Sequence, residues 1–269
     1  MKLSRTAAIF IRQIFLISSN PSRLVSIFMW LIIDVVQWGF ISRYLSSLGS
    51  DTFSFITVIL GAVILWEFMS RIQQGILMGF MEDIWTQNLI NLFASPLKIK
   101  EYLTGLVMTS FTTGIISFLI MALLAGAIFG YNILRIGLLI IPFMAILLIF
   151  GISMGILVIT MIFKFGPTAE WLGWPVPLVL SLFSGVFFPI STLPEWMGIF
   201  AMIIPPSYIF EALRAIITTG SYDYSIMQRL TISAFLSVIY TIATSILFLH
   251  VYKKNLEKGN IARFNAEAL

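Results

Sequence analysis

The chain contains no cysteine and a single histidine, His250, which follows the last apolar run. The lack of cysteine excludes disulfides and thiolate metal ligands. One histidine is too few for an imidazole metal centre, and a serine hydrolase would need more than this chain offers. The sequence also has no phosphate loop of the form G-x-x-x-x-G-K-[ST] and no basic, aromatic-rich nucleic-acid surface. We therefore expect no catalytic residue, metal, bound cofactor or nucleic acid partner, and we rank an intramembrane enzyme last.

Charge is scarce as well. Only 10% of the 269 residues are charged, 59% are hydrophobic, and the mean hydropathy is +1.01. Soluble domains are about 25% charged, so this composition indicates a polytopic membrane protein. The predicted fold is an all-α membrane protein with one transmembrane domain over 1–269. We predict six spans, at about 24–45, 53–80, 103–129, 134–163, 175–190 and 226–250.

The basic residues are distributed unevenly between the two sides that six spans create. The N-terminal arm, the loops at 81–101 and 164–174, and the tail from 251 share one side and hold eleven of the sixteen Lys and Arg residues. Excess Lys and Arg marks the cytoplasmic side of a membrane. We therefore expect a multi-pass protein of the cell (inner) membrane with both termini in the cytoplasm.

The segment 184–217 is apolar but repeatedly interrupted by proline. Pro189, Pro194 and the pair Pro205-Pro206 each end or kink a helix, because proline lacks an N–H and clashes with the preceding turn. The resulting helices are too short to cross about 30 Å of hydrocarbon, which takes roughly 20 residues. Broken backbone at membrane depth persists only inside protein or beside a wet cavity. We expect a re-entrant helical hairpin on the outer side, before the last span.

The N-terminal arm, 1–20, is amphipathic. Lys2, Arg5 and Arg12 share one helical face, and apolar residues such as Phe10 and Ile14 line the other. We expect an interface helix on the cytoplasmic surface, with its basic face toward anionic lipid headgroups. A plain membrane anchor and a role in coupling remain equally open.

The loop at 81–101 predicts a short helix outside the membrane. Glu82 and Asp83 suit a helix N-terminus. An apolar stripe follows at helical spacing, and Ser95-Pro96 ends the helix. Such a stripe must be buried against headgroups or another protein. The residues of this candidate coupling helix, within 81–97, are Glu82, Asp83, Trp85, Leu89, Leu92, Phe93, Ser95 and Pro96.

A few polar residues lie inside the predicted spans, where charges usually face the interior of the helix bundle. Asp34 and Gln37 lie in the first span. Glu67 and Arg71 are four residues apart in the second, in the order that favours an ion pair. Either a packing role or a role in transport fits these residues. Glu195, Glu211 and Arg214 in the broken segment would cap its short helices or line an outer vestibule.

Together these features resemble the type-2 ATP-binding-cassette (ABC) transporter permeases of the bacterial export class. The similarity rests on Ser184-Gly-Val-Phe-Phe-Pro189, Leu193-Pro-Glu-Trp196, Pro205-Pro-Ser-Tyr208 and Glu211-Ala-Leu-Arg214, on the loop that ends in Ser95-Pro96, and on Pro21-x-Arg23 with Trp30, Asp34 and Trp38. The resemblance implies a homodimer or pseudo-dimer with two separate ATPase subunits that bind ATP and Mg²⁺. Residues 81–96 would dock on the ATPase. The outer segment, with Phe187 and Phe188, would act as a gate for an amphiphilic, lipid-like, glycan or drug-like substrate.

Two other classes of function remain. A secondary transporter or channel would use Asp34, Glu67 and Arg71 as an ion or proton site and need no ATPase. Against it, charges are few and no inverted repeat is visible. A structural membrane subunit would tolerate apolar substitutions at Asp34 and Gln37 without loss of function.

Overall fold

The computed structural model describes residues 2–47, 52–220 and 223–258, and all regular elements in these ranges are helical, as predicted. The elements in chain order are α1 (Leu3–Ser18), α2 (Pro21–Ser47), α3 (Thr52–Trp85), α4 (Leu89–Ala94), α5 (Ile99–Phe129), the 3₁₀ helix η1 (Ile133–Leu139), α6 (Ile140–Phe165), the 3₁₀ helix η2 (Pro167–Gly173), α7 (Pro175–Phe183), the 3₁₀ helix η3 (Ile190–Thr192), α8 (Glu195–Ile203), α9 (Pro205–Thr219) and α10 (Tyr224–Glu257).

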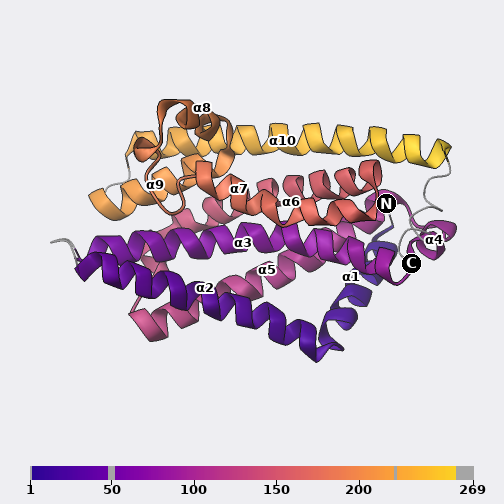
Figure 1. The fold of residues 1–269 in the computed structure, drawn as a ribbon, viewed down its shortest axis with the longest axis horizontal. Helices are drawn as coiled ribbons and strands as arrows, with labels where there is room; N and C mark the ends of the chain where they lie inside the picture. Colours follow the sequence, from indigo (N-terminus) through magenta and orange to yellow (C-terminus); the bar gives the residue numbers. More distant parts are fainter. Residues whose placement is uncertain (1, 48–51, 221–222, 259–269) are drawn as a thin grey trace.

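The long helices form a bundle with two distinct ends (Figure 1). Helices α3, α6 and α10 run along its length, and α2 and α5 are inclined to them. Helices α1 and α4 lie at one end, where α10 also terminates, and α8 and α9 lie at the other. We refer to these as the α4 end and the α8 end. The arrangement brings the N-terminal helix, the 81–101 loop and the last turns of α10 to the same end, as the sequence predicts.

Helix α3 is the centre of the bundle. It packs against α2, α5, α6 and α9, and almost all of its apolar side chains from Ile59 onward are buried. A helix that is apolar all round belongs in such an interior. Gly151 of α6 permits the close approach of α3, because a Cβ at that position would lie 2.9 Å from the carbonyl oxygen of Met69.

Three stretches within the described residues are long and apolar enough to cross a membrane. They are Ile99–Phe129, Ile136–Phe165 and Tyr224–Glu257. Helices α8 and α9 form a fourth candidate if the bent pair is counted as one span; they meet at an angle of 102°. Five of the six predicted spans coincide with long helices, namely α2, α3, α5, α6 and α10.

The fifth predicted span, 175–190, is not one continuous helix. Helix α7 has nine residues, and residues 184–189 are not helical. At about 1.5 Å per residue, nine residues cover roughly half of the hydrocarbon core. Pro175 can begin a helix because its missing N–H would have no partner in the first turn. The chain then leaves helical geometry at Gly185, which has a φ of 72°.

The proline-broken segment has the predicted form of two short helices. Helix α8 begins at Glu195, directly after Pro194, and α9 begins at Pro205. Between them Ile204 is extended, with φ −95° and ψ 113°. The residue before a proline disfavours helical geometry, which accounts for the sharp bend at this position.

The helix expected over 82–94 is divided, and its predicted start is wrong. Helix α3 continues to Trp85, so Glu82 and Asp83 lie in its last turns. A tight turn follows, with Gln87 in the left-handed region at φ 55°, and only the six residues of α4 lie beyond it. A carboxylate near a helix C-terminus is disfavoured by the helix dipole, so Asp83 needs compensation from elsewhere in the chain.

Candidate functional site

A cavity of about 470 Å³ lies among α2, α3 and α5. It brings together three of the residues singled out in the sequence, Asp34 of α2 with Glu67 and Arg71 of α3. The cavity extends toward the α4 end, where Gln13 of α1 and Gly79 of α3 also line it. Its volume lies in the range of about 300–1,000 Å³ that is typical of small-molecule sites.

The predicted ion pair between Glu67 and Arg71 is confirmed, with 3.6 Å between Oε2 and Nη2. Both side chains are largely buried, at 18% and 15% exposed. Asp34 lies close enough for its charge to interact with both. Three charges from two helices therefore face one cavity.

The wall contributed by α5 is polar, a feature that the sequence analysis missed. Thr109, Ser110, Thr113 and Ser117 all line the cavity. Thr109, Thr113 and Ser117 are spaced four residues apart, which places them on one helical face. The hydroxyls of Thr109 and Ser110 donate to backbone carbonyls one turn earlier, at 3.0 and 2.8 Å, so their oxygens can still accept hydrogen bonds from a ligand.

Gln37 does not belong to this cavity. Its side chain is exposed, so the predicted role beside Asp34 is not supported by its position. The neighbouring Trp38 instead stacks on Phe187, with ring centroids 4.1 Å apart and planes at 10°. This contact links α2 to the non-helical segment 184–189. Phe188, the other aromatic residue of the predicted gate, is half-buried.

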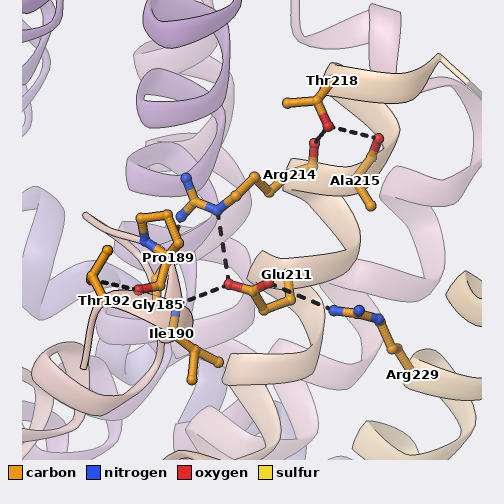
Figure 2. Close-up of polar contacts among 9 residues, drawn as sticks. All are labelled: Gly185, Pro189, Ile190, Thr192, Glu211, Arg214, Ala215, Thr218 and Arg229. Atoms are coloured by element: carbon orange, nitrogen blue, oxygen red, sulfur yellow. Dashed lines mark hydrogen bonds and ion pairs between the residues drawn. The ribbon is translucent and has the colours of Figure 1, made fainter. Parts of the chain in front are cut away.

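A polar network at the α8 end joins the 185–192 segment to α9 and α10 (Figure 2). Glu211 accepts a hydrogen bond from the backbone N–H of Ile190 at 3.1 Å. The same carboxylate forms ion pairs with Arg214 at 3.8 Å and Arg229 at 3.7 Å. Arg214 also donates to the carbonyl of Gly185 at 2.9 Å.

These contacts give Glu211 and Arg214 a capping and packing role, and Glu211 also lines a second cavity, so both alternatives that the sequence left open fit this part of the chain. The sequence alone did not predict the ion pair of Arg229, because its partner Glu211 is 18 residues away on another helix. Glu195 is exposed at the start of α8 and is not among the described residues that form this network. A second cavity of about 480 Å³ lies among α8, α9 and α10 and is lined by Tyr208, Glu211 and Arg229.

At the α4 end, α1 is fixed to the ends of α3 and α5. Arg12 donates to the buried carboxylate of Asp83, which also accepts from the hydroxyl of Tyr102 at 2.7 Å. Burial disfavours the charge of Arg12, but the hydrogen bond and charge of Asp83 outweigh it, so the pKa of Arg12 is raised above its ordinary value. Asp83 thus receives the compensation that its place at the end of α3 requires.

A second set of contacts joins α1 to the turn after α4. Arg5 donates to the carbonyl of Pro96 and lies 3.6 Å from the carboxylate of Glu101. The backbone N–H of Lys2 donates to Glu101 at 2.6 Å. The expectation that Arg5 and Arg12 face lipid headgroups is therefore wrong, because both pair with the protein itself. We call these two sets of contacts the α1 clamp.

Only part of the apolar stripe predicted for the coupling helix, which consists of Trp85, Leu89, Leu92 and Phe93, faces inward. Leu89 is fully buried, and Leu92 packs against the core. The outer surface of this turn instead presents Trp85, 52% exposed, and Ile90, 39% exposed. Ser95 and Pro96 are exposed, and the side chain of Phe93 lies outside the described residues. A partner at this end would contact Trp85 and Ile90 rather than Leu89.

The described residues contain no group of three or more His, Cys, Asp or Glu side chains that could hold a metal ion. The site consists instead of a partly charged cavity between apolar helices and a polar clamp at one end of the bundle. Helices of this length and composition define a multi-pass membrane protein.

Comparison with known families identifies the class more closely. The family model described as "ABC-2 type transporter" matches residues 5–218, so the chain belongs to the ABC-2 type transporter family. No curated protein matched the chain. Membership makes the chain a permease component of an ABC transporter, a class that generally works with an ABC ATPase.

Proposed function

We propose that this chain is the transmembrane permease subunit of an ATP-driven exporter in the cytoplasmic (inner) membrane. Two copies would form a homodimer with two separate ABC ATPase subunits, which bind ATP and Mg²⁺. The cargo would be an amphiphilic, lipid-like, glycan or drug-like molecule. The observation that carries the proposal is the α1 clamp, which ties the exposed turn at α4 to α3 and α5, two helices that line the cavity.

The clamp gives a physical route for coupling. A partner can shift the protein between two states only if it binds them with different affinity. Closure of an ATPase dimer against Trp85 and Ile90 would push on the end of α3. Because Asp83 is bonded to Arg12 and Tyr102, α1 and the start of α5 would move with it. The walls of the cavity would then change their relative tilt.

The proposed topology has six crossings and places the α4 end in the cytoplasm. The excess of Lys and Arg at 2–23, 98–100, 164 and 253–263 supports this orientation. Helix α1 would lie in the cytoplasmic interface, where its exposed Ile11 and Phe15 suit contact with lipid. η2, α7 and residues 184–192 would together make the fifth crossing, and α8 and α9 would form the outer re-entrant hairpin.

The docking surface can be tested by affinity purification of the tagged chain. Wild type is expected to retain an ABC ATPase in stoichiometric amount. Trp85→Asp combined with Ile90→Asp is expected to lose it, because two charges would replace an exposed apolar surface. Trp196→Asp is the control, since Trp196 is also an exposed tryptophan but lies in α8 at the other end of the bundle. Retention of the ATPase by the double variant would contradict docking at α4.

The cavity also favours a second candidate function, a transporter driven by an ion gradient. Asp34, Glu67 and Arg71 face one space between membrane helices, and charges in such places commonly lie on ion pathways. Transport that depends on a proton or sodium gradient and persists without any ATPase would favour this alternative.

A further inference from the structure

The cavity among α2, α3 and α5 carries unequal charge. Its described lining residues include two carboxylates, Asp34 and Glu67, and one guanidinium, Arg71. Glu67 and Arg71 neutralise one another at 3.6 Å. In the described part of the chain Asp34 has no salt bridge within 4 Å, although it lies near the pair. The cavity therefore keeps one unbalanced negative charge.

Two tryptophans stand in the same wall. Trp30 lies one helical turn before Asp34 on α2, so the indole and the carboxylate share a face. Trp174, at the start of α7, lines the cavity from another element. An aromatic face attracts cations through its quadrupole, by about 0.5–2 kcal/mol depending on desolvation. A carboxylate and two indole rings that line one cavity are an arrangement that suits organic cations.

The remainder of the wall suits the body of an amphiphile. Ile17, Met78 and Leu106 supply apolar surface, and the α5 hydroxyls supply hydrogen-bond acceptors along one side. Methionine adapts to ligands of different shape because its side chain is flexible and polarizable. A volume of about 470 Å³ accommodates a drug-sized molecule rather than a bare ion.

We propose that this cavity binds an amphiphilic organic cation, with its charged group near Asp34 and Trp30 and its apolar body against Met78 and Leu106. This assignment names the class of substrate and rests on the proposed role of the chain as a permease. An anion would meet two carboxylates, and the one guanidinium is already paired. An inorganic cation would find a mainly apolar surface and, among the described residues, no cluster of three acidic, histidine or cysteine ligands.

The test uses two probes of matched size and shape and opposite charge, tetraphenylphosphonium and tetraphenylborate. Binding of each to the purified full-length chain in detergent is measured by equilibrium dialysis. We expect saturable binding of the phosphonium only. Asp34→Asn should weaken it about ten-fold, which corresponds to about 1.4 kcal/mol. Arg71→Gln should strengthen it several-fold, because the cavity then carries one more net negative charge.

Glu257→Gln is the control, since it removes a carboxylate that is exposed in the last turn of α10, outside the cavity. Each variant is first checked for a monodisperse elution peak and an unchanged unfolding midpoint. If Asp34→Asn does not fold, the opposite shift expected for Arg71→Gln keeps the proposal testable. Equal binding of both probes, or an Arg71→Gln variant that binds the phosphonium more weakly, overturns it.

The outcome is separable from that of the exporter proposal, because dialysis needs no ATPase. Phosphonium binding with the expected variant pattern, in a chain that never co-purifies with an ATPase, supports the cation site and contradicts the exporter. If the chain co-purifies with an ATPase but does not bind the phosphonium, the exporter proposal stands and the proposed substrate class is overturned.

Discussion

Arg12 of α1 and Asp83 of α3 are 71 residues apart in sequence and hydrogen-bonded to each other in the fold, at the C-terminal end of α3. Asp83 is fully buried and also accepts from Tyr102 of α5. A single carboxylate thus joins three helices at the end where an ATPase would dock. The pair is the structural centre of the coupling proposed for this permease.

Removing Arg12 should destabilise the chain measurably. Arg12→Ala leaves the carboxylate of Asp83 buried without its cation, a change that costs about 3–5 kcal/mol in fully buried pairs. Because Arg12 is 28% exposed, we expect its removal to lower the free energy of unfolding by about 2 kcal/mol. Chemical unfolding in detergent measures this loss. The double variant Arg12→Ala with Asp83→Asn should lose less stability than the sum of the losses of Arg12→Ala and Asp83→Asn alone. Strict additivity would show that the two side chains do not interact.

The two faces of α4 should respond differently to the same substitution. Leu89→Asp places a charge in the core and should lower the unfolding midpoint or prevent folding, because Leu89 is fully buried. Ile90→Asp changes an exposed position and should leave the midpoint close to that of wild type. A comparison of both variants by thermal unfolding checks which face packs inward. Equal losses would mean that the orientation of α4 is wrong.

The contact between α6 and α3 should not tolerate an added methyl group. Gly151→Ala would bring a Cβ to 2.9 Å from the Met69 carbonyl oxygen, and overpacking of this kind costs about 1–3 kcal/mol. Gly198→Ala is the matched control, because a Cβ there meets nothing within 4 Å. The free energy of unfolding should fall for the first variant and stay level or rise for the second. A neutral Gly151→Ala would contradict the close packing of these helices.

The absence of cysteine makes the proposed topology directly measurable. Trp85→Cys should react with a membrane-impermeant maleimide only after the cytoplasmic side is opened. Trp196→Cys should react in intact cells, because α8 is proposed to lie outside. Labelling of both positions from the same side would contradict the six-crossing topology.

Local patterns in the sequence were sufficient to predict some parts of the site and of the fold. The spacing of Glu67 and Arg71 predicts their ion pair, because residues four apart are neighbours on any helix. Pro194 and Pro205 predict the breaks around α8 for an equally local reason, since proline restricts its own backbone and that of the residue before it.

Features that depend on residues far apart in the sequence could not be predicted from local patterns. Acidic residues at 82–83 look like a helix N-terminus, but Asp83 lies near a helix C-terminus, where hydrogen bonds from Arg12 and Tyr102 compensate its carboxylate. The hydroxyl face of α5 can be recognised as a cavity wall only once α3 and α2 are known to be its neighbours. A four-residue spacing, Thr109 to Thr113 to Ser117, was present in the sequence and could have drawn attention to it.

If this chain works as the permease of an ATP-driven complex, it should be extracted together with its ATPase. Mass spectrometry of the intact complex, extracted with the tagged chain in mild detergent, tests this. We expect a mass equal to two copies of this chain plus two ABC ATPase subunits. A homodimer without any ATPase, under conditions that preserve known membrane complexes, would contradict it.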